Sequence, residues 1–371
     1  MQETASLWPS ANQGRWETLD VWQRELIGPL EVLRQPVRLL IDGFDQLDGT
    51  VHGAPLRRAL TELMETVVHA SLVLTSRSDP GLPGTTVMAM PPLDEQVARR
   101  YLRGELADGR WLVLELASGQ AAADSATSLD GLYDELMAGA RARWGAPVED
   151  VLALLAAAGT GPILPIDVLE AALAKSGHTT RATLFAILGD EDLYRVIDRA
   201  GPGTPTDRVG LFHQTLADYI AARSPLLHGH RAIAEALDEL ADDHDPKDFR
   251  HQPIYAYAFD AQPSHWWEGE HPDRVVATLR RRTDVIPGVN LERWGQWSAR
   301  LQDALGPDHP DTLTTRGNIA HWTGQSGDAP GALELSKELL PDHERVLGPD
   351  HPDTLTTEAW IEELRTRLEK T

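Results

Sequence analysis

Apolar residues recur at regular spacing along most of the chain, and the kind of spacing changes near residue 110. Before that point, helical stretches at 17–34 and 55–68 alternate with short apolar runs at 37–41 and 71–75 that predict strands. Because strands and helices alternate, this part predicts a parallel α/β layer. Beyond it the three- and four-residue spacing of helices dominates, so the fold class we expect is α/β followed by all-α.

One short segment interrupts the helical part. Residues 207–212, DRVGLF, lie between predicted helices and are short enough to form one strand of a hairpin. Helices combined with a small hairpin predict a winged-helix unit. Residues 226–304 return to helical spacing, and their tryptophans are expected to pack between helices.

The end of the chain contains an internal repeat. The segment LGPDHPDTLTT occurs at 305–315 and again, letter for letter, at 347–357, an offset of 42 residues. Pro310 and Pro352 stand where a first helical residue belongs. Each repeat then predicts a helix pair that buries its apolar face by stacking on its neighbours.

Composition and charge limit the partners and the compartment. A net charge of −23 argues against nonspecific binding to nucleic acid or to an anionic membrane, because the phosphates would be repelled. No apolar run approaches the ~18 residues of a membrane span, and the first residues do not resemble a signal peptide. The absence of cysteine excludes disulfides and thiol catalysis. We therefore expect a cytoplasmic protein that binds neither nucleic acid nor membrane.

Acidic residues follow the first predicted strand in the stretch VRLLIDGFDQLDG. A carboxylate at the end of a buried strand is placed to hold magnesium beside the phosphates of a nucleotide. Asp42 occupies that place, and Asp45 would add charge or orient water. Arg77, just past the second strand, would lie at the same edge and meet a γ-phosphate. If the nucleotide site is functional, the sequence predicts ATP or ADP with Mg²⁺ at Asp42, and otherwise it predicts no cofactor. The alternative for this stretch is that Asp-Gly only forms a turn.

The front of the chain resembles the second half of a STAND-class signalling ATPase, the class that includes NACHT and NB-ARC proteins. The matching segments occur in the order of the class: RLLIDGFDQ for the Walker B strand, SLVLTSR for the sensor-1 strand, LDGLYDELM and GPILPIDVLEAAL for the helical and winged-helix segments, and GLFHQTLADYI for the winged-helix histidine motif. The resemblance implies that Asp42, Asp45, Arg77 and His213 contact the nucleotide, His213 through an ADP phosphate. Gln46 departs from the class, which commonly has a glutamate there, because an amide cannot take a proton from water.

The end of the chain resembles the tetratricopeptide repeat in its longer, kinesin-light-chain-like form, through LGPDHPDTLTTRGNIAHW and LGPDHPDTLTTEAW. The resemblance implies helices that line a groove for a partner protein. Residues 305–371 contain 13 Asp and Glu against 6 Lys and Arg, so the partner surface is expected to be basic. Trp322 and Trp360 are candidate anchors for that partner. The alternatives are that both pack between helices, and that so short an array only caps the domain before it.

The two resemblances divide the chain into five expected segments. They are a partial P-loop NTPase domain with Walker B and sensor 1 (1–110), a helical lid region (111–148), a winged-helix-like region (149–225), a helical connector (226–304) and tetratricopeptide-like repeats (305–371).

The phosphate loop G-x-x-x-x-G-K-[ST] is not found in residues 1–36. That loop supplies the backbone N–H groups and the lysine that hold the phosphates. We therefore expect a truncated product, one half of a split protein, or a degenerate domain, and we do not expect independent ATP hydrolysis. A missing central strand would also expose a hydrophobic sheet edge, through which the chain could self-associate.

The function we expect is STAND-like signalling through protein–protein interaction. One alternative is a signalling ATPase whose phosphate loop comes from another chain or was lost by truncation. A second alternative is a pure tetratricopeptide scaffold.

Overall fold

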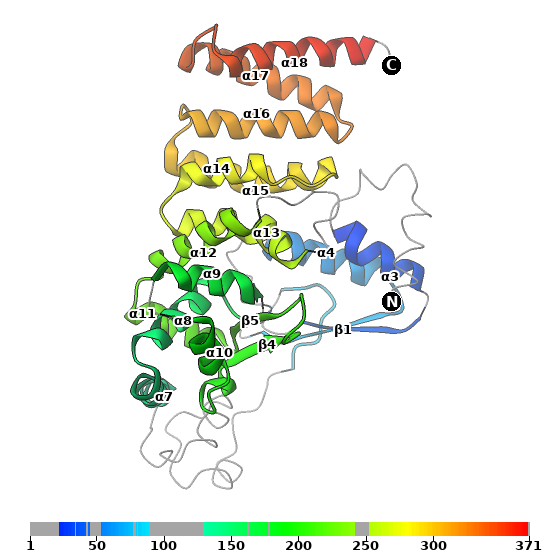
Figure 1. The fold of residues 1–371 in the computed structure, drawn as a ribbon. Coiled ribbons are helices and arrows are strands. Elements are labelled where there is room, and N and C mark those ends of the chain that lie inside the picture. The colour runs from blue at the N-terminus through cyan, green and yellow to red at the C-terminus, as the bar shows by residue number, and fades with distance from the viewer. Residues whose placement is uncertain are drawn as a thin grey trace. The chain divides into compact units, whose positions relative to one another are not determined.

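The computed structural model describes residues 22–33, 35–41, 44, 53–76, 79, 81–88, 129–161, 163–176, 179–241 and 252–369. The chain divides into two compact units. One contains the elements before residue 89 and those after residue 284, and the other contains the elements between them. Helices predominate in both units (Figure 1).

The two strands predicted near the start are present. β1 (Val37–Ile41) and β2 (Ala70–Leu74) pair in parallel, as expected for an α/β layer. The helical elements beside them are η2 (Gln23–Ile27), α3 (Gly28–Leu33) and α4 (Gly53–Thr66). The wide π turn of η2 stands just before Pro29, which has no N–H to continue an α-helical ladder. That this pair belongs to a P-loop sheet stays a prediction.

One face of the β1–β2 pair is packed and the other is exposed. Leu60 and Leu63 of α4 and the residue after β1, Phe44, belong to the core against which the strands pack. On the opposite face Leu40 is 72% exposed and Val73 is 53% exposed. Parallel strands are usually buried on both faces, whereas the exposure of β1 and β2 alternates along each strand.

The middle unit combines helices with a small antiparallel sheet. Its sheet has the order β3-β5-β4, formed by β3 (Leu164–Pro165), β4 (Ile197–Ala200) and β5 (Arg208–Leu211). β5 confirms the strand predicted at 207–212. The helical elements are α7 (Leu129–Trp144), α8 (Ala146–Ala158), α9 (Ile166–Ser176), α10 (Arg181–Leu188), η4 (Leu193–Arg195), α11 (Gln214–Arg223), α12 (Leu227–Leu240), α13 (Pro253–Glu268) and α14 (Pro272–Arg281).

Gly210 lets β5 approach the turn that follows α8. A Cβ at this position would lie 1.6 Å from the carbonyl oxygen of Gly161. The N–H of Gly161 in turn donates to the carbonyl oxygen of Leu211 at 2.8 Å. Only glycine fits a backbone approach this close.

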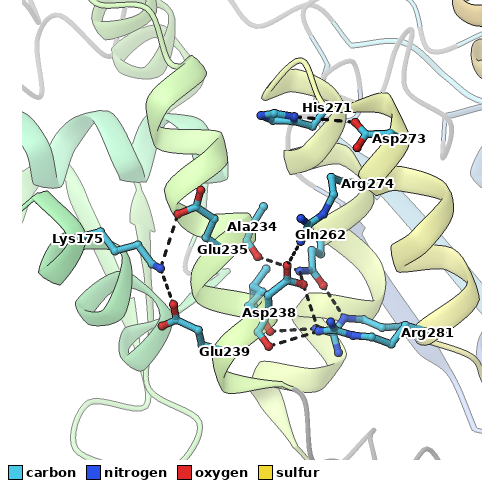
Figure 2. A network of polar contacts seen from close by, with 12 residues as sticks. Lys175, Ala234, Glu235, Asp238, Glu239, Gln262, His271, Asp273, Arg274 and Arg281 are labelled. Atoms are coloured by element: carbon cyan, nitrogen blue, oxygen red, sulfur yellow. Dashed lines mark hydrogen bonds and ion pairs between the residues drawn. The ribbon is translucent and has the colours of Figure 1, made fainter.

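A polar network joins α12, α13 and α14 (Figure 2). Asp238 of α12 accepts hydrogen bonds from Gln262 at 2.8 Å, Arg274 at 2.6 Å and Arg281 at 3.1 Å. Gln262 is fully buried and also donates to a backbone carbonyl of α12 at 2.9 Å. Arg282, also buried, donates to Gln262 and to two carbonyl oxygens at the end of α12. The network therefore satisfies the helix terminus and holds three helices in one arrangement.

Four consecutive helices complete the chain: α15 (Pro287–Leu305), α16 (Pro310–Gln325), α17 (Ala329–Val346) and α18 (Pro352–Glu369). Each packs on the next, which gives the stack seen in Figure 1. In the part of the chain that the structure describes, no helix has both the length and the apolar character needed to cross a membrane.

Candidate interaction surface and nucleotide-site residues

Both copies of the repeat begin their helix in the same way. His309 caps α16 and His351 caps α18, and in each the Nδ1 atom accepts a hydrogen bond from the backbone N–H two residues later at 3.2 Å. The glycines before them, Gly306 and Gly348, have φ angles of 91° and 94°. Identical sequence therefore produces the same turn and the same helix start in both repeats.

A third helix begins with the same tripeptide. His271-Pro272-Asp273 precedes and opens α14, as His-Pro-Asp does in α16 and α18. α15 packs on α16 and ends at Leu305. The residue 42 positions further on, Leu347, directly follows α17. Both α14 and α15 lie in the segment predicted to be a connector. His271 makes no side-chain cap hydrogen bond, unlike His309 and His351, so the tripeptide alone does not relate α14 to the repeats.

Aromatic and charged side chains gather on one surface of α16 and α18. The rings of His321 and Trp360 lie 5.2 Å apart, and His321 also contacts the ring of Trp322 at 5.0 Å. The guanidinium of Arg367 lies 5.2 Å from the centre of the Trp360 ring and pairs with Glu363 at 2.6 Å. Burial lowers the pKa of His321, so its ring is neutral at neutral pH. We call His321, Trp360, Glu363 and Arg367 the α16–α18 face.

Trp360 also has a packing role. A Cβ at Gly324 of α16 would lie 2.8 Å from Cζ2 of Trp360, so the helices meet closely at this point. Trp360 packs against the buried cluster that includes Ala332 and Leu364. Its ring is thus half inside the array, and it supports the surface more than it projects from it.

Charged residues link α16 and α17. Arg345 forms a two-pronged pair with Asp308 at 2.6 and 2.8 Å, and it contacts Asp342 at 2.8 Å. Asp342 also accepts from Arg316 at 2.7 Å. Hydrogen bonds from Arg345 and Arg316 lower the pKa of Asp342. This chain of alternating charges joins α17 to α16 and to the turn before α16.

His213, predicted to meet an ADP phosphate, stands at the start of α11. Its Nδ1 accepts from the N–H of Thr215 at 3.2 Å and lies 2.9 Å from the hydroxyl of the same residue. That hydroxyl is 2.8 Å from the hydroxyl of Tyr133 in α7. Because Nδ1 accepts, the neutral ring carries its proton on Nε2. An Nε2–H is a donor of the kind that a phosphate oxygen accepts.

The residues around His213 also tie α7 to α11. The rings of Tyr133 and Tyr219 lie 5.2 Å apart, and the hydroxyl of Tyr219 donates to Asp134. Burial, and then the hydrogen bond to Asp134, raise the pKa of Tyr219 to about 12. Arg223 lies 3.6 Å above the Tyr219 ring. His213 therefore sits in a structural junction as well as in its predicted motif.

The other predicted nucleotide residues, Asp42, Asp45 and Arg77, lie outside the described residues. The strands that lead to them end together, because Ile41 and Leu74 are paired in the parallel register. Among the described residues, no group of three or more His, Asp or Glu side chains is placed to hold a metal ion.

Comparison with protein families matches residues 312–353 to the tetratricopeptide repeat. Among solved structures, the chain is similar to a Signal Transduction ATPase with Numerous Domains (STAND) protein with a tetratricopeptide repeat sensor from Pyrococcus horikoshii, with a TM-score of 0.53 and 12% sequence identity. The match covers 99% of this chain and 57% of that one. No curated protein matches the sequence. The chain is thus similar in fold to a STAND protein with a tetratricopeptide repeat sensor, in agreement with the resemblance of its motifs, and it spans little more than half the length of that neighbour.

Proposed function

We propose that the chain is a STAND-like signalling protein that acts by binding another protein through its tetratricopeptide helices. The observation that carries the proposal is a similarity in fold along 99% of the chain combined with a tetratricopeptide match at 312–353. The repeat of the Pyrococcus protein is described as a sensor. We assign a corresponding role to α15–α18.

The α16–α18 face is the surface on which we place the partner. It presents two aromatic rings beside an exposed ion pair, and aromatic side chains are common in the centre of interfaces. Residues 305–371 contain 13 acidic against 6 basic residues. A partner with a basic surface would therefore be attracted at long range, and salt would slow its association.

We also propose a nucleotide site at the end of the β1–β2 pair. Asp42 would hold Mg²⁺, Asp45 and Arg77 would lie near the phosphates, and the Nε2–H of His213 would donate to a phosphate of ADP. The helices α8–α11 with their three-stranded sheet would form the winged helix that carries His213. No phosphate loop occurs in residues 1–36, so the 371-residue chain alone is not expected to hydrolyse ATP. An ATPase completed by another chain is the alternative for this site.

One observation favours a scaffold as the second candidate function. His213 already has a structural task, because it caps α11 and contacts the residues that join α11 to α7. A histidine kept for that reason needs no nucleotide. In a pure scaffold only the tetratricopeptide surface would be functional.

The test is partner capture by the immobilised full chain from a lysate of its own source, measured by quantitative mass spectrometry. The matched variant carries Glu363→Lys and Arg367→Glu together, which keeps the ion pair but reverses its direction. We expect at least one protein to be retained by the native chain and reduced about tenfold by the variant, the effect of roughly 1.4 kcal/mol. Retention of every captured protein by the variant would contradict the assignment of the partner to this face.

A further inference from the structure

α16 has a stripe of buried and half-buried residues where α17 covers it. The stripe consists of Leu313, Gly317, Ala320 and Gly324. A Cβ at Gly317 would lie 3.5 Å from Leu339 of α17, and one at Gly324 would lie 3.1 Å from Ala332. Leu313 and Ala320 are 0% and 1% exposed. These residues show how one helix of this array packs on the helix before it.

The residues of α18 that correspond to this stripe in the repeat are exposed. Moving by 42 residues gives Leu355, Ala359, Glu362 and Thr366. Leu355 is 49% exposed, whereas its counterpart Leu313 is fully buried. Among the described residues, nothing covers α18 as α17 covers α16. We call Leu355, Glu358, Ala359, Glu362 and Thr366 the α18 outer stripe.

A groove runs beside the α18 outer stripe, between α17 and α18. Its volume is about 330 Å³, and Leu340, Pro341 and Ile361 form its apolar part. The charged residues along it are three acidic and two basic ones: Glu344, Glu358, Glu362, Lys337 and Arg365. The groove can therefore receive an apolar row of side chains flanked by charged ones.

The charges of the outer stripe differ from those that α17 meets on α16. Arg316 pairs with Asp342 of α17 at 2.7 Å, but the counterpart of Arg316 in α18 is Glu358. Ala320 has the counterpart Glu362, which Arg365 partly neutralises at 3.1 Å. A helix that lies on α18 therefore needs a basic residue where α17 has Asp342.

A second basic residue would be held at the start of α18. Asp308, which accepts the two-pronged pair from Arg345, has the counterpart Asp350. If the covering helix lies on α18 as α17 lies on α16, its last turn meets Asp350. The occupant is thus basic at two places about one turn apart.

A separate protein fits the outer stripe better than a further array helix or a second copy. α17 approaches α16 closely because Gly317, Ala320 and Gly324 are small, whereas α18 carries the larger Glu362 and Thr366 at the last two of these positions. A helix on α18 is held further away, with charged contacts that suit an interface that can open. A second copy is disfavoured because each chain carries a net charge of −23.

We propose that the α18 outer stripe is a docking site for a basic amphipathic helix of another protein. Leu355 and the groove would take its apolar row, and Glu358 and Asp350 would pair with its basic residues. The proposal rests on the proposed function in that it treats the array as a binding element. It uses residues distinct from the α16–α18 face.

The test uses a fluorescent peptide with the sequence of Ala329–Leu347, stapled across its solvent-exposed positions Glu334 and Glu338 and shown to be helical by circular dichroism. One version is native and the other carries Asp342→Arg. Anisotropy titrations with the full chain at low salt should show that the substituted peptide binds about tenfold more tightly than the native one, a difference of about 1.4 kcal/mol. In a chain with Glu358→Arg the preference should reverse, and Leu355→Ala should weaken both peptides.

The reversal identifies the site, because binding elsewhere on an acidic protein would not depend on Glu358. Equal affinities of the two helical peptides, a preference that survives Glu358→Arg, or no binding would overturn the proposal. The paired substitution of Glu363 and Arg367 should leave peptide binding unchanged. Loss of partner capture with intact peptide binding, or the converse, therefore shows which of the two assignments fails.

Discussion

Gly324 and Gly317 belong to the same stripe of α16, but they differ in the space available for a side chain. A Cβ at Gly324 would come within 2.8 Å of Trp360 and 3.1 Å of Ala332, whereas a Cβ at Gly317 would make an ordinary contact at 3.5 Å. We expect Gly324→Ala to lower the stability of the array by about 1–3 kcal/mol, because the helices must move apart. Gly317→Ala should raise stability by up to about 1 kcal/mol, because alanine loses less entropy in a helix.

Hydrogen exchange of the amides of α16 and α17 measures both effects in the full chain. Each variant is the control for the other, since both add one methyl group to the same helix. Changes of the same sign would contradict the packing described for α18 on Gly324.

His213 can be tested as a cap independently of any nucleotide. His213→Ala should cost about 1 kcal/mol, because the N–H of Thr215 loses its acceptor. His213→Asn should be close to native, because asparagine is among the best helix caps. Thermal unfolding of the middle unit, followed by circular dichroism, compares the two. An equal loss in both variants would show that other contacts of the ring matter more than the cap.

At the scale of elements, the network around Gln262 determines how α12, α13 and α14 fit together. Gln262→Met keeps the volume but removes the acceptor for buried Arg282 and a donor to Asp238. We expect a loss of about 2–4 kcal/mol, since a buried guanidinium is left without one of its acceptors. Faster hydrogen exchange in α12 and α13, with α16 unchanged, is the expected readout. Protection equal to that of the native chain would show that the network relaxes around the change.

Sequence patterns identified the elements that depend on local apolar spacing. β1 was predicted at its observed bounds, because a five-residue stretch that is apolar except for Arg38 and is followed by the turn-forming pair Asp-Gly favours a strand. The repeat was found because its turn must supply a positive φ at Gly306 and a proline at the next helix start. The tripeptide His-Pro-Asp also opens α14, but there His271 does not cap the helix, so an identical tripeptide alone does not specify the same helix start.

The surroundings of the candidate site residues could not be read from the spacing of apolar residues along the chain. Asp42, Asp45 and Arg77 were chosen from the ends of strands, and they remain predictions. His213 was placed by its motif, and its hydrogen bonds to Thr215 are local. The contact of Thr215 with Tyr133, by contrast, joins residues 82 positions apart in the chain. The exposed state of Leu355 could not be predicted, since its segment is identical to the one that buries Leu313.

At the scale of the whole molecule, stability should fall in mild acid. The Nδ1 atoms of His230 and His265 lie 3.0 Å apart, and the hydroxyl of Tyr257 is 2.8 Å from Nε2 of His265. Burial lowers the pKa of His230 to about 4; burial, and then repulsion by His230, lower that of His265 to about 3. Their ordinary value is about 6.5, so below that pH the unfolded chain binds protons that the folded chain excludes. The stabilisation is complete above pH 6.5 and is lost as the pH falls toward 4.

The urea midpoint of the middle unit between pH 7.5 and 5 measures this effect. His230→Asn removes one of the two groups, so its midpoint should depend less steeply on pH than that of the native chain. A pH dependence unchanged by this substitution would assign the acid sensitivity to other groups.

The two identical segments at 305–315 and 347–357 have a consequence for inheritance. Each contains the same glycine turn and the same opening of a helix, so a recombination that aligns one with the other joins equivalent backbone. Loss of 42 residues would lead from α15 directly into α18, and a gain of 42 would insert one more helix pair. Neither event interrupts a helix or a turn. The number of stacked helices can therefore change in a single genetic event that leaves every remaining helix and turn intact.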